Sequence, residues 1–269
     1  MEKISSLHSP HVGRVKAFLG SRGKKNRELE NTFVVEGIQA VREALLPKMG
    51  EGLKVKQLFL SPAGIAKLQI EFDLDALSNV EIFETSEQVM NEMTDSQSPQ
   101  GILALCSTKS LKIEDLWRIA PSKIAYFWQI QDPGNAGTVI RTADACGFDA
   151  VIFSDNSVDI FNPKTVRATV GSLWHLPVIT DLEINQFIVE ALDKNFEVYA
   201  MTADGENTLN AEYARQCQKN SVWIFGNEAR GLPELPDSVK KVQIPMKGHA
   251  ESLNVASAAS ILMHLIGVN

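Results

Sequence analysis

The sequence lacks several signals that would assign it to a common class of protein. Its 269 residues include only three cysteines, Cys106, Cys146 and Cys217, with no CxxC pair. This odd and widely spaced set argues against a disulfide framework or a zinc knuckle, and it predicts a reducing cytoplasm as the location. The five histidines are scattered and form no HExxH motif, so we expect no metal site.

Long apolar runs and bulk positive charge are also missing. No apolar stretch approaches the roughly 20 residues of a membrane helix, and the start of the chain lacks a secretory signal, so we expect no membrane association. The net charge of −7 disfavours a protein that coats nucleic acid through bulk charge. With 44% hydrophobic and 22% charged residues, the composition predicts a globular protein of one large or two small domains.

The positive charge of the chain is concentrated at its start. Residues 1–30 hold seven basic and three acidic side chains, a surplus of four positive charges. We call residues 1–30 the leader. A basic leader attached to an otherwise acidic chain is typical of a polyanion-binding extension, although a solvated helical tail has the same composition. The side chains expected to contact phosphates are Arg14, Lys16, Arg22, Lys24, Lys25 and Arg27.

Strand-like and helix-like patterns alternate after the leader. Residues 31–106 form a first unit large enough for a small α/β domain. Residues 107–122 mix charged and polar side chains and are interpreted as a linker. In residues 123–269, short apolar strands alternate with helices, which predicts a parallel sheet covered on both faces. The fold class expected from these patterns is α/β.

The phosphate-binding loops of common nucleotide enzymes are absent, because the sequence contains no GxGxxG and no GxxxxGK[ST] motif. The segment DPGNAG at 132–137 instead joins a strand to a helix that we expect to begin at Gly137. Asn135 lies in the turn and Arg141 lies in the helix, so both can face the sheet edge where ligands bind. The alternative is that Asn135 caps the helix and Arg141 is a surface charge.

Two further strand ends carry conspicuous residues. The strand 222–226 ends in Gly226-Asn227-Glu228, where glycine allows close backbone approach and Glu228 is either a site carboxylate or an exposed turn residue. The strand 241–246 leads to a helix at 253–266 that is rich in small residues, with Ser252 as its predicted N-cap. A simple capped core helix has the same features.

Taken together, the three segments resemble the signature motifs of the SpoU/TrmH family of RNA ribose 2′-O-methyltransferases, which belong to the SPOUT class. The first motif of the family has an asparagine and an arginine at the spacing of Asn135 and Arg141. The second has a GxExxG core, matched at 226–231, and the third reads IPMxGxxxSLNVAxAxxI, matched at 244–261. One departure is RATVG at 167–171, where family members often have RAS followed by alanine or methionine and glycine.

The front of the chain also resembles this family. The segments FVVEGIQAVREAL at 33–45 and SPQGILALC at 98–106 are similar to the start and end of its L30e-like RNA substrate-binding domain. The resemblance therefore implies a SPOUT-type parallel sheet with a C-terminal trefoil knot, preceded by a small L30e-like α/β domain. The implied domains are a basic leader at 1–30, the L30e-like domain at 31–106, a linker at 107–122 and a SpoU-type methyltransferase domain at 123–269.

The activity implied by the resemblance is S-adenosylmethionine-dependent methyl transfer to a ribose 2′-hydroxyl of structured RNA. The leader and front domain favour large-subunit ribosomal RNA over transfer RNA as the substrate. A catalytically inactive RNA-binding assembly protein and a small-molecule α/β enzyme are the alternatives. The family also implies a homodimer, with an interface that includes the helix beginning at Gly137 and the helix 253–266.

Residue roles follow from the motif positions. Arg141 is the implied catalytic residue and acts on the 2′-hydroxyl, either as a proton acceptor or as an electrostatic stabiliser of the developing alkoxide. The residues implied to position Arg141 and the ribose are Asn135, Glu228, Ser252 and Asn254. The residues implied to hold the cofactor are Gly226, Ile244 and Leu253.

Overall fold

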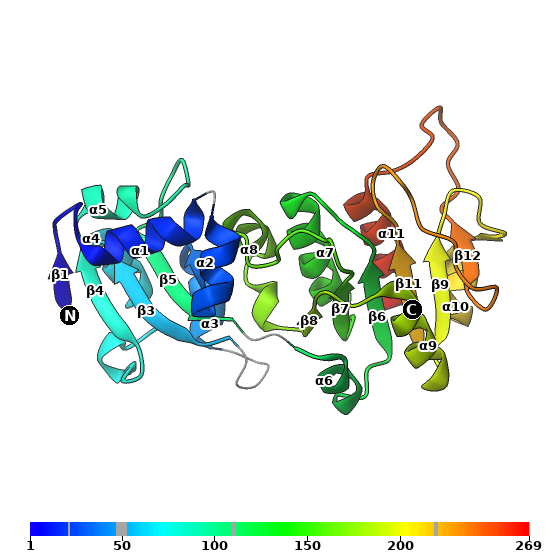
Figure 1. Cartoon of the computed structure of the whole chain (residues 1–269), viewed down its shortest axis with the longest axis horizontal. Helices are drawn as coiled ribbons and strands as arrows, with labels where there is room; N and C mark the ends of the chain where they lie inside the picture. The colour runs from blue at the N-terminus through cyan, green and yellow to red at the C-terminus, as the bar shows by residue number, and fades with distance from the viewer. Residues whose placement is uncertain (21, 47–52, 109–110, 218–219, 269) are drawn as a thin grey trace. The chain divides into compact units, whose positions relative to one another are not determined.

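The computed structural model describes residues 1–20, 22–46, 53–108, 111–217 and 220–268. The chain forms two compact units, one comprising Met1–Lys109 with Asp159–His175 and the other comprising Ser110–Val158 with Leu176–Asn269 (Figure 1). Residues 109 and 110 of the predicted linker lie outside the described residues. Within the described ranges, no helix is both long enough and apolar enough to span a membrane.

The first unit contains a five-stranded sheet in the order β1-β4-β3-β5-β2. β5 runs antiparallel to both of its neighbours, whereas β1, β4 and β3 are parallel. The strands are β1 (Glu2–Ile4), β2 (Thr32–Glu36), β3 (Val55–Leu60), β4 (Glu81–Thr85) and β5 (Ile102–Ser107). The helices are α1 (Pro10–Leu19), α2 (Gly23–Glu30), α3 (Ile38–Leu45), α4 (Pro62–Leu68), α5 (Glu87–Glu92) and α8 (Pro163–Thr169), with 3-10 turns at Leu74–Ala76 and Ser172–Trp174.

The leader is an integral part of this unit. β1 adds a strand beside β4, and α1 buries Val12, Val15 and Phe18, which recur at helical spacing on one face. Arg27 is only 5% exposed, and its guanidinium donates hydrogen bonds to the Asp159 carboxylate at 3.1 and 2.6 Å and to the Phe18 carbonyl. The prediction that Arg27 contacts RNA phosphates is therefore wrong, because the protein already neutralises this charge in its interior.

The second unit contains a seven-stranded sheet in the order β10-β12-β9-β11-β6-β7-β8, and every pairing in it is parallel. The strands are β6 (Lys123–Phe127), β7 (Ala150–Phe153), β8 (Val178–Ile179), β9 (Glu197–Met201), β10 (Asn207–Thr208), β11 (Ser221–Phe225) and β12 (Lys240–Gln243). The helices are α6 (Ile113–Arg118), α7 (Pro133–Ala145), α9 (Ile184–Asp193), α10 (Ala211–Gln216) and α11 (Val255–Gly267). The predicted α/β class with a parallel sheet is confirmed, while the trefoil knot stays a prediction.

The central strands of this sheet are buried and almost entirely apolar. Every residue of β7 and of β11 is buried, as expected for parallel strands covered on both faces. The segment predicted as a linker contributes α6, whose Leu116 is fully buried in the same core. The indole N–H of Trp117 on α6 donates to the Glu190 carboxylate on α9 at 3.2 Å, which holds α6 against the unit.

Two helices of the second unit begin at residues other than those predicted. α7 begins at Pro133 and not at Gly137, because the Asp132 carboxylate accepts the N–H of Asn135 at 2.8 Å and proline favours a first helical position. Asn135 therefore lies in the first turn of α7 and does not cap it. The N-cap of α11 is Asn254 and not Ser252, because the Asn254 side chain accepts the N–H groups of the second and third helical residues.

The small residues of α11 pack against α7 in the same chain. The hydroxyl oxygens of Thr142 and Ser260 lie 3.4 Å apart, and a Cβ added to Gly267 would lie 2.2 Å from the Cys146 carbonyl oxygen. The small side chains thus allow a close helix–helix approach within one chain. They do not by themselves require a second copy of the protein.

Candidate active site

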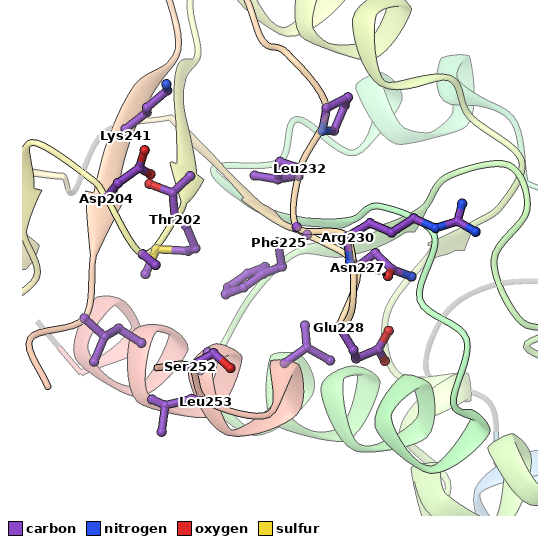
Figure 2. A pocket seen from close by; sticks show the side chains of 18 of the residues that line it. Thr202, Asp204, Phe225, Asn227, Glu228, Arg230, Leu232, Lys241, Ser252 and Leu253 are labelled. Carbon is purple, nitrogen blue, oxygen red and sulfur yellow. Dashed lines mark hydrogen bonds between the residues drawn. The ribbon is translucent and has the colours of Figure 1, made fainter. Parts of the chain in front are cut away.

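A pocket of about 750 Å³ lies at the carboxyl ends of three parallel strands of the second unit. It is formed by the residues that follow β9, β11 and β12 and by the start of α11 (Figure 2). Ligands of open α/β sheets bind at this edge, and the volume is in the range of small-molecule and cofactor sites. The predicted site residues that line the pocket are Gly226, Glu228, Ile244, Ser252 and Leu253.

The loop after β11 closes on itself and forms one wall of the pocket. The Asn227 N–H donates to the Gly231 carbonyl at 2.9 Å, and the Gly231 N–H donates to the Asn227 carbonyl at 3.0 Å. A Cβ on Gly226 would lie 2.6 Å from the carbonyl carbon of Gly231, and Gly231 itself has a φ of +67°. Both glycines are therefore needed for this closure, which holds the backbone groups of the loop in fixed positions at the pocket.

A chain of hydrogen bonds connects the three motifs at the edge of the pocket. The Asn254 amide donates to the Asn135 side-chain oxygen at 3.1 Å, and the Asn135 amide donates to the Glu228 carboxylate at 3.1 Å. The Asn135 carboxamide is thereby oriented, since its oxygen faces a donor and its nitrogen faces an acceptor. Residues that are 93 and 119 positions apart in the sequence thus form a single polar group.

Arg141 and Ser252 stand outside this chain of hydrogen bonds. Arg141 lies further along α7 and is exposed, and its guanidinium has no hydrogen-bond or ion-pair partner among the residues that the structure describes. Ser252 lines the pocket, and its hydroxyl likewise has no hydrogen-bond partner within the described ranges. Both side chains are available to a bound molecule.

Ile244 and Leu253 supply apolar surface to the pocket from two different segments. Ile244 follows β12, and Leu253, which is 39% exposed, precedes α11. Figure 2 shows Ser252 and Leu253 at the start of α11, with Thr202, Asp204 and Lys241 on the β9 and β12 side of the pocket. Apolar side chains beside fixed backbone groups suit the binding of a flat heterocycle.

Sequence reasoning missed the residues that support the loop after β11. The Asn227 side chain bonds to Gln129, which follows β6, and Gln129 in turn bonds to Ser154, which follows β7. The position of Asn227 between Gly226 and Glu228 was the only signal in the sequence, because Gln129 is 98 residues away from Asn227 along the chain.

The segment 167–171, which departs from the family pattern, does not line the pocket. Within it, the Thr169 hydroxyl donates to the Val166 carbonyl at 2.7 Å.

The comparisons with known proteins agree with these motifs. Residues 122–264 match the SpoU rRNA Methylase family, and residues 13–104 match the MRM3-like substrate binding domain. The Bacillus subtilis (strain 168) protein 23S rRNA (guanosine(2553)-2′-O)-methyltransferase RlmP is 34% identical over 98% of this chain and 100% of its own length.

Solved structures resemble the whole chain. The AdoMet-bound rRNA methyltransferase from Sinorhizobium meliloti has a TM-score of 0.82 and 28% identity, and the match covers 98% of this chain and 97% of that one. The SpoU methyltransferase AviRb from Streptomyces viridochromogenes has a TM-score of 0.79 and 25% identity, with 97% of each chain covered. The resemblance read from the three motifs is confirmed, and the chain belongs to the SpoU rRNA methylase family.

Proposed function

We propose that this protein transfers a methyl group from S-adenosylmethionine to a ribose 2′-hydroxyl of large-subunit ribosomal RNA. The observation that carries the proposal is the hydrogen-bonded chain Asn254–Asn135–Glu228, which joins all three motifs at the edge of a cofactor-sized pocket. The B. subtilis relative, which matches 98% of this chain, is named as a 23S rRNA methyltransferase, and this name supports the ribosomal target. Transfer RNA is the second candidate, because other relatives are named tRNA/rRNA methyltransferases.

The pocket fits S-adenosylmethionine in size, apolar lining and charge. Its volume of about 750 Å³ accommodates a nucleoside with an amino-acid tail, and Ile244 and Leu253 can flank the faces of the adenine. The charged side chains around it are five carboxylates and two cations, a balance that favours a positively charged ligand such as a sulfonium. These side chains are Asp204, Glu228, Glu234, Asp237, Glu251, Arg230 and Lys241.

The side chains at the pocket edge would align the ribose and handle its proton. When bound, S-adenosylmethionine supplies a methyl group on a positively charged sulfur and leaves as a neutral thioether. Arg141 acts on the 2′-hydroxyl, either by accepting its proton or by stabilising the oxygen as the proton leaves. Asn135 and Glu228 hold the ribose hydroxyls by hydrogen bonds, and Ser252 and Asn254 complete the positioning group.

A homodimer is part of the same proposal. Ile261 on α11 is 40% exposed, and Met246, which lines the rim of the pocket, is 39% exposed. Apolar side chains at this exposure, next to the site, support an interface between two copies of the chain. Sedimentation at micromolar concentration tests it, and a monomer that still turns over would contradict it.

Mapping ribose methylation by mass spectrometry in a strain that lacks the protein tests the RNA target. Loss of one 2′-O-methyl group from large-subunit ribosomal RNA, restored when the gene is returned, is the expected result. Loss from a transfer RNA would favour the second candidate, and an unchanged methylation pattern would reject both. A ribosomal substrate also fits a protein that works in the cytoplasm, which remains our proposal for its location.

A further inference from the structure

The side chain of Asn227 has three hydrogen-bond partners in two different loops. Its oxygen accepts the backbone N–H groups of Ala229 at 2.9 Å and of Arg230 at 3.0 Å, which shapes the loop after β11. Its amide nitrogen donates to the carbonyl of Gln129 at 2.7 Å, in the loop between β6 and α7. The two ends of one carboxamide therefore perform separate tasks, one within the loop and one between loops.

The residue that receives this bond has an unfavourable backbone conformation. Gln129 has a φ of +49°, in the left-handed region that residues with a side chain rarely adopt. Its N–H donates to the Ser154 hydroxyl at 2.8 Å, and its carbonyl also accepts from the Gln131 side-chain amide at 3.0 Å. Such conformations persist where surrounding bonds hold them and are frequent at functional sites.

The bond between Asn227 and Gln129 lies beside the bond between Asn135 and Glu228, and both connect the loop after β11 to the β6–α7 loop or the first turn of α7. Asn227 immediately precedes Glu228 in the loop that lines the pocket. Gln129 leads into α7, the helix that carries Asn135 and Arg141. The pocket wall and the start of α7 are therefore fixed to each other at two points.

We infer that Asn227 is a positioning residue, which holds the pocket wall in register with the helix that carries Arg141. The inference rests on the proposed function, because methyl transfer requires the acceptor oxygen in line with the methyl group. The pocket wall would set the position of the methyl group, and α7 would set the position of the ribose. An error of about 1 Å between two such groups can cost about 100-fold in rate.

Two substitutions at Asn227 separate its two tasks. Asn227→Asp keeps an oxygen for the N–H groups of the loop but places a carboxylate against the Gln129 carbonyl, so only the bond between loops is removed. We expect kcat at saturating RNA to fall at least about tenfold, while the Kd for S-adenosylmethionine stays within about threefold. Asn227→Ala removes both sets of bonds, so we expect both kcat and cofactor affinity to fall at least about tenfold.

A matched control is Asn26→Asp in the first unit. The Asn26 amide donates to the Ala17 carbonyl at 2.7 Å, the same type of bond at the same distance, and we expect kcat to be unchanged. If Asn227→Asp has the kcat of the wild type, or loses cofactor affinity as fully as Asn227→Ala, the inference is wrong. If Asn227→Asp does not fold, Ser154→Ala provides a second test, because it removes the hydroxyl that accepts the Gln129 N–H. Unchanged kcat in Ser154→Ala would equally reject the inference.

The wild-type protein in the same assay separates this inference from the proposed function. Absence of methyl transfer by the wild type to any ribosomal or transfer RNA would reject the proposed function itself. Turnover by the wild type together with full turnover by Asn227→Asp would reject only the positioning role. The comparison of kcat with cofactor Kd is needed because a merely structural defect would lower kcat and raise the Kd together.

Discussion

The two units of the chain use their positive charges differently. In the first unit, several basic side chains, most of them in the leader, are paired with acidic side chains of the same unit. The pairs include Lys3–Glu84, Arg14–Glu30, Lys16–Glu92, Arg27–Asp159 and Arg167–Asp95. In the second unit, several cations near the motif loops have no ion-pair partner among the described residues. These cations are Arg141, Arg230, Lys241 and Lys247.

This difference shows why a count of charges along the sequence misplaces a binding surface. The leader has the largest positive surplus, yet part of it is neutralised by its own fold. The second unit, in contrast, has unpaired cations close to the loops where the three motifs meet. A basic side chain contributes to RNA binding through counterion release only where it is free to approach a phosphate. The second unit, which holds the unpaired cations, is therefore the better candidate for contact with the target nucleotide.

The largest effect on stability is expected from Arg27, the buried cation of the first unit. Arg27→Met leaves the Asp159 carboxylate, which is 16% exposed, without its partner at 2.6 Å. Removing one member of a buried pair costs about 3–5 kcal/mol in the free energy of unfolding, measured by chemical denaturation. The double variant with Asp159→Asn should recover much of this loss, and methyl transfer per folded molecule should be unchanged.

An exposed pair of the same unit provides the control. Arg14→Met breaks the pair with Glu30, whose members are 38% and 40% exposed, and should cost less than about 1 kcal/mol. Equal losses of stability for Arg27→Met and Arg14→Met would contradict the structural role that we assign to Arg27. A selective loss of RNA affinity in Arg27→Met, with stability unchanged, would contradict it as well.

The next largest effect is expected on catalysis, from Arg141 of the second unit. Arg141→Ala should lower the rate of methyl transfer about 100- to 1000-fold, roughly 3–4 kcal/mol, because one donor to the developing charge is removed. Calorimetry should give a nearly normal Kd for S-adenosylmethionine, since Arg141 does not line the pocket. Loss of cofactor binding would mean that the role assigned to Arg141 is wrong.

Two further substitutions refine the role of Arg141. Arg141→Lys keeps the charge but not the planar fork, so partial activity would favour electrostatic stabilisation over proton acceptance. Arg215→Ala removes another exposed arginine of the same unit, on α10 and away from the pocket lining, and should leave turnover unchanged. A similar fall in turnover in Arg215→Ala would indicate a general effect of charge on RNA binding.

These residues also show where sequence reasoning succeeds and where it fails. The parallel sheet was predictable because buried strands such as β7 and β11 are runs of apolar residues, with Ser221 at the start of β11 as the one polar member. Asn135 and Glu228 were candidates from their positions at strand ends, but only the resemblance assigned them to one site, because no local pattern indicates that residues 93 positions apart share a hydrogen bond. The first residue of α11 was not predictable from the sequence, since Ser252 and Asn254 are both good caps and only the backbone path decides between them.

Arg27 and Asn227 could not be predicted for a different reason. The partner of Arg27 is Asp159, which is 132 residues away, and the partner of Asn227 is Gln129, which is 98 residues away. A charge in a basic run is usually solvated, and an asparagine beside glycine is usually a turn residue. Their actual roles depend on long-range interactions that composition and periodicity do not encode.

A smaller effect is expected from the leader cations that have no partner. Arg22 and Lys25 are exposed and have no ion-pair partner within the described part of the chain. If they bind phosphates, Arg22→Ala with Lys25→Ala should reduce the slope of log K against log salt by about 1 for each phosphate that is no longer neutralised. Lys16→Ala, which removes a cation already paired with Glu92, should change the slope less, and an unaltered slope in both would assign the leader a purely structural role.

The smallest effect is expected from Glu183, where the second unit uses a charge for local structure. Its carboxylate caps α9 and accepts the N–H groups of Asn185 at 3.0 Å and Gln186 at 2.8 Å, and these bonds lower the pKa of the carboxyl below its usual value. A carboxyl whose pKa is lower in the folded state stabilises the protein above the unfolded pKa, and this contribution disappears as the pH falls through the folded value. Glu183→Ala should therefore cost about 0.5–1 kcal/mol at neutral pH and progressively less in acid. Denaturation midpoints of the two proteins that stay equally far apart down to low pH would show that the cap does not act through its charge.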